Sequence, residues 1–479
     1  MKKIGFSLIF LCFLVFSNLF SEKYIRSGAT GLNDGSNWYN AYSNIPESLE
    51  RGETYYIADG YYPGPHYFDD IENGSQWILF KKATKLFHGT SSGWNDSYGE
   101  DQAILNNIQI SRDYYEIDGV EGGGDPNWID NFGIKIEYIS GYTYPLNEKL
   151  VALVGPSDFA LNQPQNLNFK HIDFKHGGIG LDINGDIIYT YPPNSFSEGV
   201  KNVYIGHSYL HDCARNQILT FLSENWTVEY SFFARNFSSS ERHSEGWQDF
   251  GGQNMTIRNN IWEDITGTSF IALKKNFGYE QSNFMIYGNV FIYTELYDGQ
   301  LGGQGVVGDT DEVDAVTKDI YIFNNTIYNV FGWNAGFSFT GGTNEDIHAF
   351  NNLFVDNPSS IRVDQSSVIS DYNFYYHNYT YSSEHSSGLN DKILDSNPLE
   401  DPSNFIFNLS EEIGPGISID QFIVENPLLA TFFSDDSYLY DMHNTKRGDG
   451  LFWDPGALEY ISFSSLDKPF KPSGIKVRN

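Results

Sequence analysis

The stretches NVYIGHSYL (202–210), NWTVEYSFF (225–233) and NMTIRNNIW (254–262) share one nine-residue pattern, and this pattern decides the fold. Apolar residues stand at its second, fourth and ninth places, and a small polar residue stands at its seventh. The pattern returns as NFMIYGNVF (283–291), DIYIFNNTI (319–327) and DIHAFNNLF (346–354), at intervals of 23, 29, 29, 36 and 27 residues. A fixed strand pattern at variable intervals predicts a solenoid whose loops take up the insertions.

The alternation of apolar residues within the pattern indicates β-strands. At roughly 23 or more residues per turn, we expect an all-β chain wound as a right-handed parallel β-helix. The seventh-place residues should then stack and hydrogen-bond along an internal ladder at the roughly 4.8 Å strand spacing. These residues are Ser208, Ser231, Asn260, Asn289, Asn325 and Asn352. A β-sandwich with accidental similarity is the alternative, and six copies in one register argue against it.

The composition limits the possible partners. The chain of 479 residues has a formal net charge of −33, which argues against a nucleic-acid binder and against a binder of anionic membranes, because both need a basic face. An acidic surface also serves solubility alone. Aromatic residues make up 16% of the chain. In a β-helix they can stack in the interior or lie outside as flat platforms for sugar rings.

The N-terminus predicts secretion. Lys2 and Lys3 precede an apolar stretch (4–16) and a polar exit (17–21), which is the pattern of a signal peptide. We therefore divide the chain into a signal peptide (1–21), a β-helix domain (22–462) and a C-terminal tail (463–479), with no membrane span in the mature chain. Only Cys213 would remain after cleavage, so no intrachain disulfide can form. We expect a secreted or periplasmic monomer.

Three runs outside the repeats carry a family resemblance. GLNDGSNWYNAY (31–42), GETYYIADGYY (52–62, with Glu53 where Asp is usual) and DPGALEY (454–460) resemble the opening and closing phrases of secreted bacterial β-helix proteins of the pectate-lyase-like superfamily. The resemblance is specific for the fold and says little about the chemistry. We expect a polysaccharide as the partner. Between the first two runs we predict a short helix over 45–51, which would cap the first turn of the solenoid.

The longest intervals follow the copies at 225, 254 and 283, so we expect a substrate groove centred on residues 234–315. The run RHSEGWQDFGG (242–252) is the most suggestive stretch in it. In an extended strand His243, Glu245, Trp247 and Asp249 share one face, because strand side chains alternate. Imidazole and carboxyl groups transfer protons, and an indole can stack on a sugar, so we interpret this face as the groove. The alternatives are a solvated strand or the opposite phase, with Trp247 in the core.

Neighbouring turns supply further candidates. We expect His207, His211, Arg215, Arg235 and Lys275 to bind substrate, for example by neutralising a uronate carboxylate, and Lys274 or His243 to move the proton. The run GDTDEVD (308–314) places oxygen ligands at a spacing that suits Ca²⁺, although it lacks the EF-hand pattern. Its candidate metal ligands are Asp309, Asp311 and Asp314.

Three functions remain open: a polysaccharide lyase acting on a uronate polymer, a glycoside hydrolase with paired carboxylates, and a non-catalytic adhesin or glycan-binding protein. Glu245 and Asp249 would lie roughly 13 Å apart on a strand, too far for a hydrolase pair. A hydrolase would therefore recruit a second carboxylate from Glu263, Asp264 or Asp309. We favour the lyase.

The preference for a lyase rests on a further local resemblance. The pair Ser244–Glu245, with Gly267 and Lys274 on the following turn, is similar to a motif of alginate- and chondroitin-type β-helix lyases. Phe250 stands where those lyases carry their catalytic Lys, so the resemblance does not identify the base.

Overall fold

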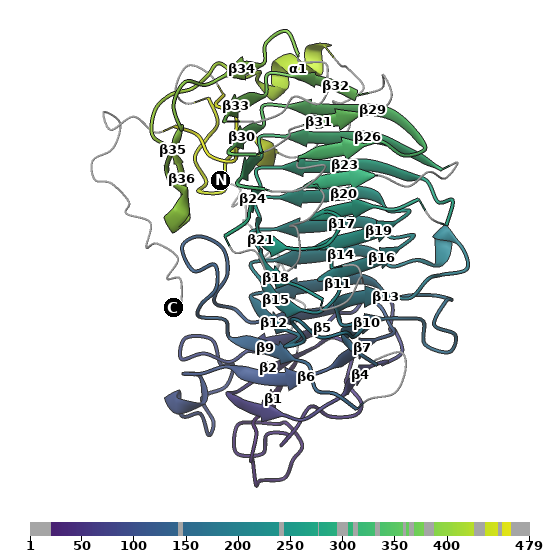
Figure 1. Cartoon of the computed structure of the whole chain (residues 1–479). Helices are drawn as coiled ribbons and strands as arrows, with labels where there is room; N and C mark the ends of the chain where they lie inside the picture. The colour runs from purple at the N-terminus through teal and green to yellow at the C-terminus, as the bar shows by residue number, and fades with distance from the viewer. Residues whose placement is uncertain are drawn as a thin grey trace, which may run out of the picture.

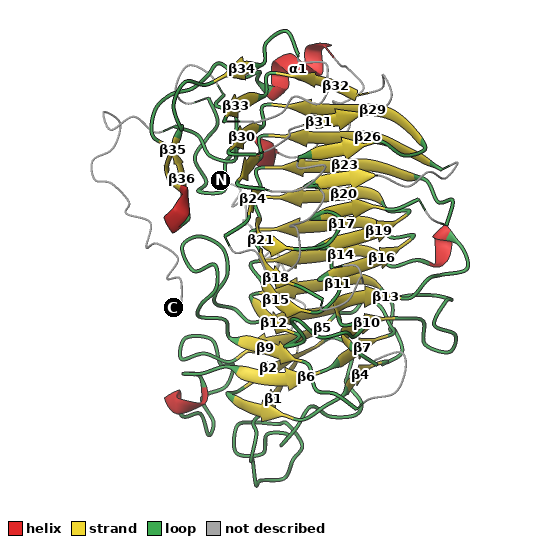
Figure 2. Ribbon diagram, in the orientation of Figure 1, coloured by secondary structure: helices red, strands yellow, loops and turns green. Residues whose placement is uncertain are grey.

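The computed structural model describes residues 21–460 except for 142–146, 239–243, 276, 295–304, 310–314, 331–335, 358–360, 364–367, 378–387, 426–435 and 449–452. The described chain winds into a coil of three long parallel sheets, here called A, B and C (Figures 1 and 2). Each complete turn gives one strand to sheet A, one to sheet B and one to sheet C. The chain is therefore the right-handed parallel β-helix that the repeats predict.

The strands of each sheet follow one another in chain order. Sheet A contains β1 (Ser21–Ile25), β2 (Glu53–Ile57), β5 (Ile78–Lys82), β8 (Tyr115–Asp118), β11 (Gln165–Lys170), β14 (Lys201–Gly206), β17 (Glu224–Glu229), β20 (Gln253–Arg258), β23 (Gln281–Tyr287), β26 (Val316–Phe323), β29 (Thr343–Phe350) and β32 (Val368–Asp371). Sheet B contains β3 (Gly60–Tyr62), β6 (Ala103–Asn106), β9 (Ile134–Glu137), β12 (Ile172–Lys175), β15 (Tyr209–Cys213), β18 (Phe232–Asn236), β21 (Ile261–Ile265), β24 (Val290–Ile292), β27 (Thr326–Tyr328), β30 (Leu353–Val355), β33 (Phe374–Tyr376) and β34 (Lys392–Ile393). Sheet C contains β4 (His66–Phe68), β7 (Ile108–Ile110), β10 (Lys149–Leu153), β13 (Asp186–Thr190), β16 (Ile218–Phe221), β19 (Trp247–Phe250), β22 (Ile271–Leu273), β25 (Val307–Asp309), β28 (Phe337–Phe339) and β31 (Ile361–Val363).

The remaining elements are short. β35 (Leu399–Asp401) and β36 (Ile406–Leu409) pair antiparallel and form a hairpin outside the coil. The described helices are α1 (Ile419–Glu425) and the single-turn 3₁₀ helices η1 (Asp96–Tyr98), η2 (Phe196–Glu198), η3 (Pro402–Asn404) and η5 (Asp436–Leu439). In the described part of the chain, no helix is long and apolar enough to cross a membrane.

The nine-residue pattern spans the bend between sheets A and B rather than one straight strand. Its sixth residue is left-handed at this bend; His207 has a φ of 52°, for example. The seventh-place side chains form the predicted ladder: the backbone N–H groups of Ser231, Asn260 and Asn289 each donate to the side-chain oxygen of the next ladder residue at 3.0 Å. The ladder satisfies buried backbone groups that the bend would otherwise leave without partners.

The interior of the coil is filled by stacked apolar side chains, one layer per turn. On the inner face of sheet B the ring of Phe233 stacks on that of Trp262 with 3.8 Å between centroids, and Phe354 stacks on Tyr375 at 5.3 Å. Strands in register bring the same pattern position of each turn into contact, so the repeat in the sequence becomes a continuous core.

The predicted helix over 45–51 is not formed; the segment consists of bends and a turn. Ile45 and Leu49 nevertheless pack on the main core cluster. Side-chain partners hold the irregular backbone, since the Asp70 carboxylate accepts from Leu49 N at 2.7 Å and the Tyr55 hydroxyl accepts from Glu50 N at 2.8 Å. Seven residues beginning with Ile-Pro are too few for a stable helix without such partners.

The described parts of residues 396–460 fold back along the coil. Leu399, Phe407 and Leu409 pack in one apolar cluster with outward-facing residues of sheet B such as Val290 and Leu353. The closing phrase anchors this segment, because Ala457 N donates to Thr326 Oγ1 at 2.9 Å and Gly456 N donates to Asn351 O at 2.8 Å. The outer face of sheet B is therefore covered at its C-terminal end.

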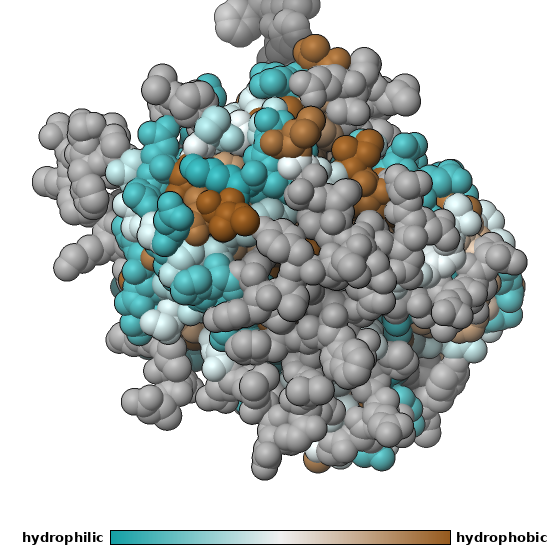
Figure 3. All heavy atoms as spheres, turned by 45° about the horizontal axis from the view of Figure 1, so that its top comes forward, coloured by the Kyte–Doolittle hydropathy of each residue, from teal (hydrophilic) through white to brown (hydrophobic). Residues whose placement is uncertain are grey.

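The C-terminal segment also reaches the last turn of the coil. Phe422 of α1 stacks on Phe350 of sheet A with 4.0 Å between centroids. Exposed apolar side chains remain in this region, among them Ile369, Ile393 and Val424, and the view from this end shows apolar patches beside hydrophilic ones (Figure 3).

Candidate functional site

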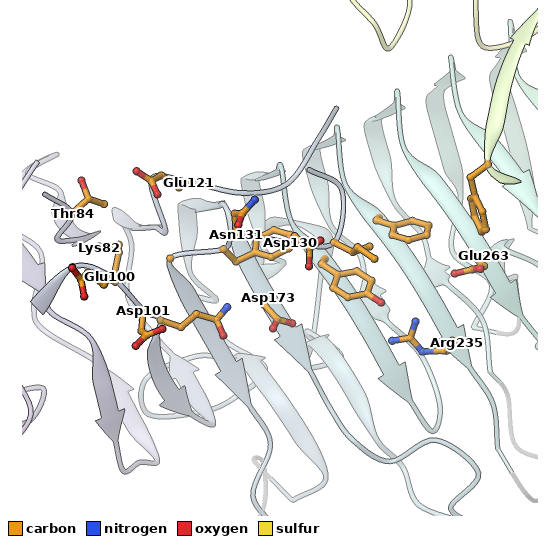
Figure 4. Close-up of a pocket in the computed structure, with 18 of the residues that line it drawn as sticks. Lys82, Thr84, Glu100, Asp101, Glu121, Asp130, Asn131, Asp173, Arg235 and Glu263 are labelled. Atoms are coloured by element: carbon orange, nitrogen blue, oxygen red, sulfur yellow. The ribbon is translucent and has the colours of Figure 1, made fainter. Parts of the chain in front are cut away.

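A groove of about 740 Å³ lies on the outer face of sheet B (Figure 4). This volume is within the usual range for a ligand site. Consecutive strands β12, β15, β18 and β21 form its floor. The lining residues are Lys82, Thr84, Gly99, Glu100, Asp101, Gln102, Glu121, Ile129, Asp130, Asn131, Phe132, Gly133, Asp173, Tyr209, Phe232, Arg235, Glu263, Asp264, Thr294 and Phe405.

The insertion between β8 and β9 forms a side wall of the groove. Its backbone follows the corner between sheets A and B, where Gly122 O contacts His171 Nδ1 at 2.6 Å. A Cβ on Gly123 would meet the carbonyl oxygen of His207 at 1.8 Å, so this close approach requires glycine. The insertion then returns Phe132 to the groove, where its ring stacks on Tyr209 with 6.3 Å between centroids.

Left-handed residues at the ends of the sheet B strands bring polar side chains together. Asp212, Arg235 and Asp264 have φ values of 55°, 50° and 53° and follow one another across β15, β18 and β21. Such a residue breaks the alternation of the strand, so two successive side chains turn outward before the next points in. The outward pairs are His211–Asp212 and Glu263–Asp264.

His211 is held between two carboxylates. Its Nε2 lies 2.7 Å from Asp173 Oδ1, its Nδ1 lies 2.9 Å from Asp212 Oδ2, and its ring stacks on Tyr209 at 4.0 Å. Arg235 Nε donates to the other oxygen of Asp212 at 2.6 Å. Burial raises the pKa of Asp212, but the hydrogen bonds and charges of His211 and Arg235 outweigh it and hold this pKa well below its usual range.

Glu263 and Asp264 form a close carboxyl pair. The Oγ1 atom of Thr294 lies 3.1 Å from Glu263 Oε1 and 2.7 Å from Asp264 Oδ2, so these two oxygens are at most 5.8 Å apart. The backbone N–H of Thr294 donates to Asp264 Oδ1 at 2.7 Å. The two carboxyl groups of retaining glycosidases are roughly 5–5.5 Å apart, a separation that this pair can adopt.

The groove is acidic. Seven carboxylates line it, and its described cations, Lys82 and Arg235, are each paired with a carboxylate: Lys82 Nζ lies 2.6 Å from Asp59, and Arg235 pairs with Asp212. Such a field repels an anionic chain. The carboxylates are Glu100, Asp101, Glu121, Asp130, Asp173, Glu263 and Asp264.

The face predicted from 242–252 is not the groove. Trp247 lies in the main core cluster, and the side chains of Glu245 and Asp249 are also fully buried. The phase of β19 is therefore the alternative one, with Trp247 inside, where its Nε1 donates to Thr220 Oγ1 at 2.8 Å. The core accepts these carboxyls because partners meet them: Thr268 Oγ1 donates to Glu245 at 2.6 Å, and Thr220 Oγ1 and Gly252 N donate to Asp249 at 2.6 and 2.7 Å.

Burial raises the pKa of Asp249 from the usual 3.8 to about 6, and the hydrogen bonds from Thr220, Gly252 and Gln281 only partly oppose it. The folded state then holds this proton more tightly than the unfolded state, so stability falls as pH rises through about 6. Between pH 5 and pH 8 we expect the natural chain to lose about 1 kcal/mol relative to Asp249→Asn. Urea unfolding of both proteins at the two pH values measures this, and parallel pH profiles would contradict it.

The other predicted site residues divide between the groove and the scaffold. His211 and Arg235 contribute to the groove network, whereas His207 stacks between His171 and Tyr230 under the insertion, at 5.0 and 5.2 Å. Lys275 is buried and donates to Gly341 O at 2.8 Å, Lys274 is also buried, and Arg215 lies 3.3 Å from the buried Asp186. None of these three cations lines the groove.

Some predicted residues cannot be placed. His243, Asp311 and Asp314 lie outside the described residues, and Asp309 is described only as the last residue of β25. Across the ranges given above, no group of three or more His, Cys, Asp or Glu is arranged to hold a metal ion. The Ca²⁺ site stays a prediction.

Several groove residues escaped the sequence analysis. Asp173, Tyr209 and Phe232 occupy one outward position on consecutive strands, as their pairing shows. Tyr209 and Phe232 fall at the eighth place of their patterns, and the alternation marks that place as outward. Phe405 and Asp130 come from segments without periodicity, so no local signal marks them.

No protein-family model matches the sequence, and a search of curated proteins finds no match. Solved structures that are similar include a GH136 lacto-N-biosidase from Eubacterium ramulus (10% identity, TM-score 0.46, covering 78% of this chain and 68% of that one). The pectate lyase Pel9A is similar at 13% identity and a TM-score of 0.43, covering 93% of this chain and 98% of that one. A family 28 exopolygalacturonase of Yersinia enterocolitica is similar at 12% identity and a TM-score of 0.38, covering 79% of each chain. The predicted fold is confirmed by the three parallel sheets of the chain itself. No activity is transferred at such low identity.

Proposed function

We propose that this chain is a carbohydrate-active enzyme that hydrolyses a neutral glycan in the groove on sheet B. The observation that carries the proposal is the Glu263–Asp264 pair, whose oxygens lie at most 5.8 Å apart around Thr294 Oγ1, at 3.1 and 2.7 Å from it. The acidic lining supports a neutral substrate over a uronate polymer. Phe132 and Tyr209 line the groove as well and make part of it apolar.

In this mechanism Asp264, which accepts hydrogen bonds on both oxygens, attacks the anomeric carbon and forms a glycosyl ester. Glu263 donates its proton to the departing glycosidic oxygen as the C–O bond breaks. Water then attacks the ester, Glu263 takes up its proton, and Asp264 leaves as a carboxylate. The network of His211, Asp212 and Arg235 lies on β15 and β18, the two strands that precede β21 in sheet B. It holds the floor of the groove in place.

A second candidate, β-elimination from a uronate, is favoured by one observation. Arg235 lines the groove and its guanidinium lies 3.0 Å from Nδ1 of the buried His211, and a lyase needs a base beside a cation. Both groups are engaged with Asp212, which is the reason for ranking the lyase second. A glycan-binding protein without turnover would need only the groove. Secretion and a monomeric state remain predictions from the sequence.

The test is a screen of the purified mature chain on neutral and acidic polysaccharides, with reducing ends and ultraviolet absorbance read together. We expect new reducing ends from a neutral glycan without new absorbance. Absorbance that grows with reducing ends on a uronate polymer would establish the lyase instead. Loss of that signal with a chelator would support the Ca²⁺ site. Binding without either signal would identify a glycan-binding protein.

A further inference from the structure

The Glu263–Asp264 pair stands at one end of the groove. The lining extends from Lys82 and Glu100, near the second turn of the coil, to Thr294, which follows β24. Glu263, Asp264 and Thr294 are the members of the lining that lie furthest along sheet B. A sugar chain placed in the groove would therefore have most of its contacts on one side of the bond that this pair can reach.

Beyond the pair, the outer face of sheet B is closed. The outward-facing residues Val290, Ile292, Leu353 and Val355 are each 0% exposed. They share one apolar cluster with Leu399, Phe407, Leu409, Ile413, Met442 and Leu458 of the C-terminal segment. Filled apolar contact of this kind leaves no channel for a glycan to continue along the strands.

Phe405 borders the groove at its covered end and packs against this apolar cluster. It follows η3 at the tip of the β35–β36 hairpin, lines the groove, and meets the ring of Phe232 edge-on with 6.4 Å between centroids. Its left-handed φ of 60° turns the chain there. Phe407 of the same hairpin meets Tyr328 at 6.4 Å.

The opposite end differs. On the first strands of sheet B, the outward side chain of Tyr61 is 50% exposed, and those of Ile104 and Lys135 are half-buried. Among the described residues, no apolar layer like the one over Val290 covers them. Five strand spacings separate β6 from β21, or roughly 24 Å, which gives an extended chain a path in that direction only.

We propose that the groove is blind at its Glu263 end, and that the enzyme removes short units from the end of a neutral glycan instead of cutting within the chain. This inference rests on the proposed function. The terminal sugars sit beside the carboxyl pair with Phe405 bordering them, and the rest of the polymer leaves over β12, β9 and β6. Phe405 thereby determines specificity by excluding further sugars beyond the cleaved bond.

The experiment follows digestion of four neutral polysaccharides (mannan, xylan, galactan and β-glucan), with viscosity and reducing ends read together and products sized by chromatography. We expect short products from the earliest time points, and a slow fall in viscosity per reducing end. A rapid fall in viscosity with long early products would overturn the blind-end proposal while leaving hydrolysis intact. No cleavage of any polysaccharide would overturn the proposed function and this inference with it.

Two variants sharpen the result. Phe405→Gly removes the bordering ring and suits the left-handed backbone, so we expect longer early products and at least a threefold steeper viscosity loss per reducing end. Phe277→Ala removes an aromatic ring that is 58% exposed and packs on Phe250 of sheet C, away from the groove, and should leave the product sizes unchanged. Identical product sizes in Phe405→Gly and the natural chain, with both folded by circular dichroism, would remove Phe405 from this role.

Discussion

Replacing Glu263 by Gln should reduce glycan hydrolysis by about 10²–10⁴-fold, the usual contribution of a positioned acid or base. The amide keeps the shape of the side chain and can still contact Thr294, but it cannot give its proton to the glycosidic oxygen. Asp264→Asn should reduce activity by a similar factor, because the amide is not a nucleophile. The double variant should lose little more than either single variant, since the two carboxyls act in one reaction.

The matched control is Glu137→Gln. Glu137 occupies the same outward position on β9 as Glu263 does on β21, is half-buried, and does not line the groove. Its loss should change kcat/KM by less than about twofold, in line with a surface substitution away from the chemistry. Initial rates on the best neutral substrate, with thermal unfolding to verify the fold, make the comparison. Full activity in Glu263→Gln would exclude this pair as the catalytic carboxyls.

Replacing Asn289 by Ala should destabilise the fold by about 4 kcal/mol. Its amide nitrogen donates to Ile257 O, Tyr287 O and Asn325 Oδ1 at 2.9–3.1 Å, and its oxygen accepts from Asn260 N and Asn260 Nδ2 at 3.0 Å. Alanine leaves these buried groups without partners, at roughly 1–3 kcal/mol for each that finds no replacement. Chemical unfolding measures the loss. Hydrogen exchange should localise it to the adjacent bends, because each turn contacts only its neighbours.

A second asparagine serves as the control for the ladder. Asn225 is the first residue of its pattern, exposed, and left-handed at a φ of 57°, and its amide donates to Asn202 at 3.0 Å. Asn225→Gly keeps the backbone conformation accessible and removes only this exposed contact, so we expect a loss of less than about 1 kcal/mol. Equal losses in the two variants would show that the buried ladder has no special weight in the stability.

The repeats predicted the architecture because a solenoid repeats its contacts with its sequence. The ladder residues follow directly from the seventh place of the pattern, and Asn260, Asn289 and Asn325 hydrogen-bond as that place predicts. Extending the pattern by two places would also have aligned Asp212, Arg235 and Asp264, all at the eleventh place. The side chains at this place lie on the outer face of sheet B, so the groove floor could have been predicted from the sequence.

Two features could not have been predicted from the sequence. The polar run at 242–252 looked outward by its composition, yet Asp249 is buried with hydrogen bonds from Thr220, on the preceding turn, and from Gly252 at the end of the run. A periodic pattern shows that the side chains of a strand alternate between two faces, but not which of the two sets faces the core. The covered end of the groove depends on contacts such as that of Ala457 with Thr326, 131 positions apart, which no local pattern encodes.

The folded-back segment sets an order for the maturation of the protein. The coil can wind turn by turn as the chain emerges, since every strand pairs with one already formed. Until residues 396–460 arrive, however, the strip that includes Val290, Ile292 and Leu353 has no cover and would attract other chains. The coil and the end of the groove thus form in two stages, and a chain cut before the hairpin would be a wound coil with an exposed apolar face and an incomplete groove.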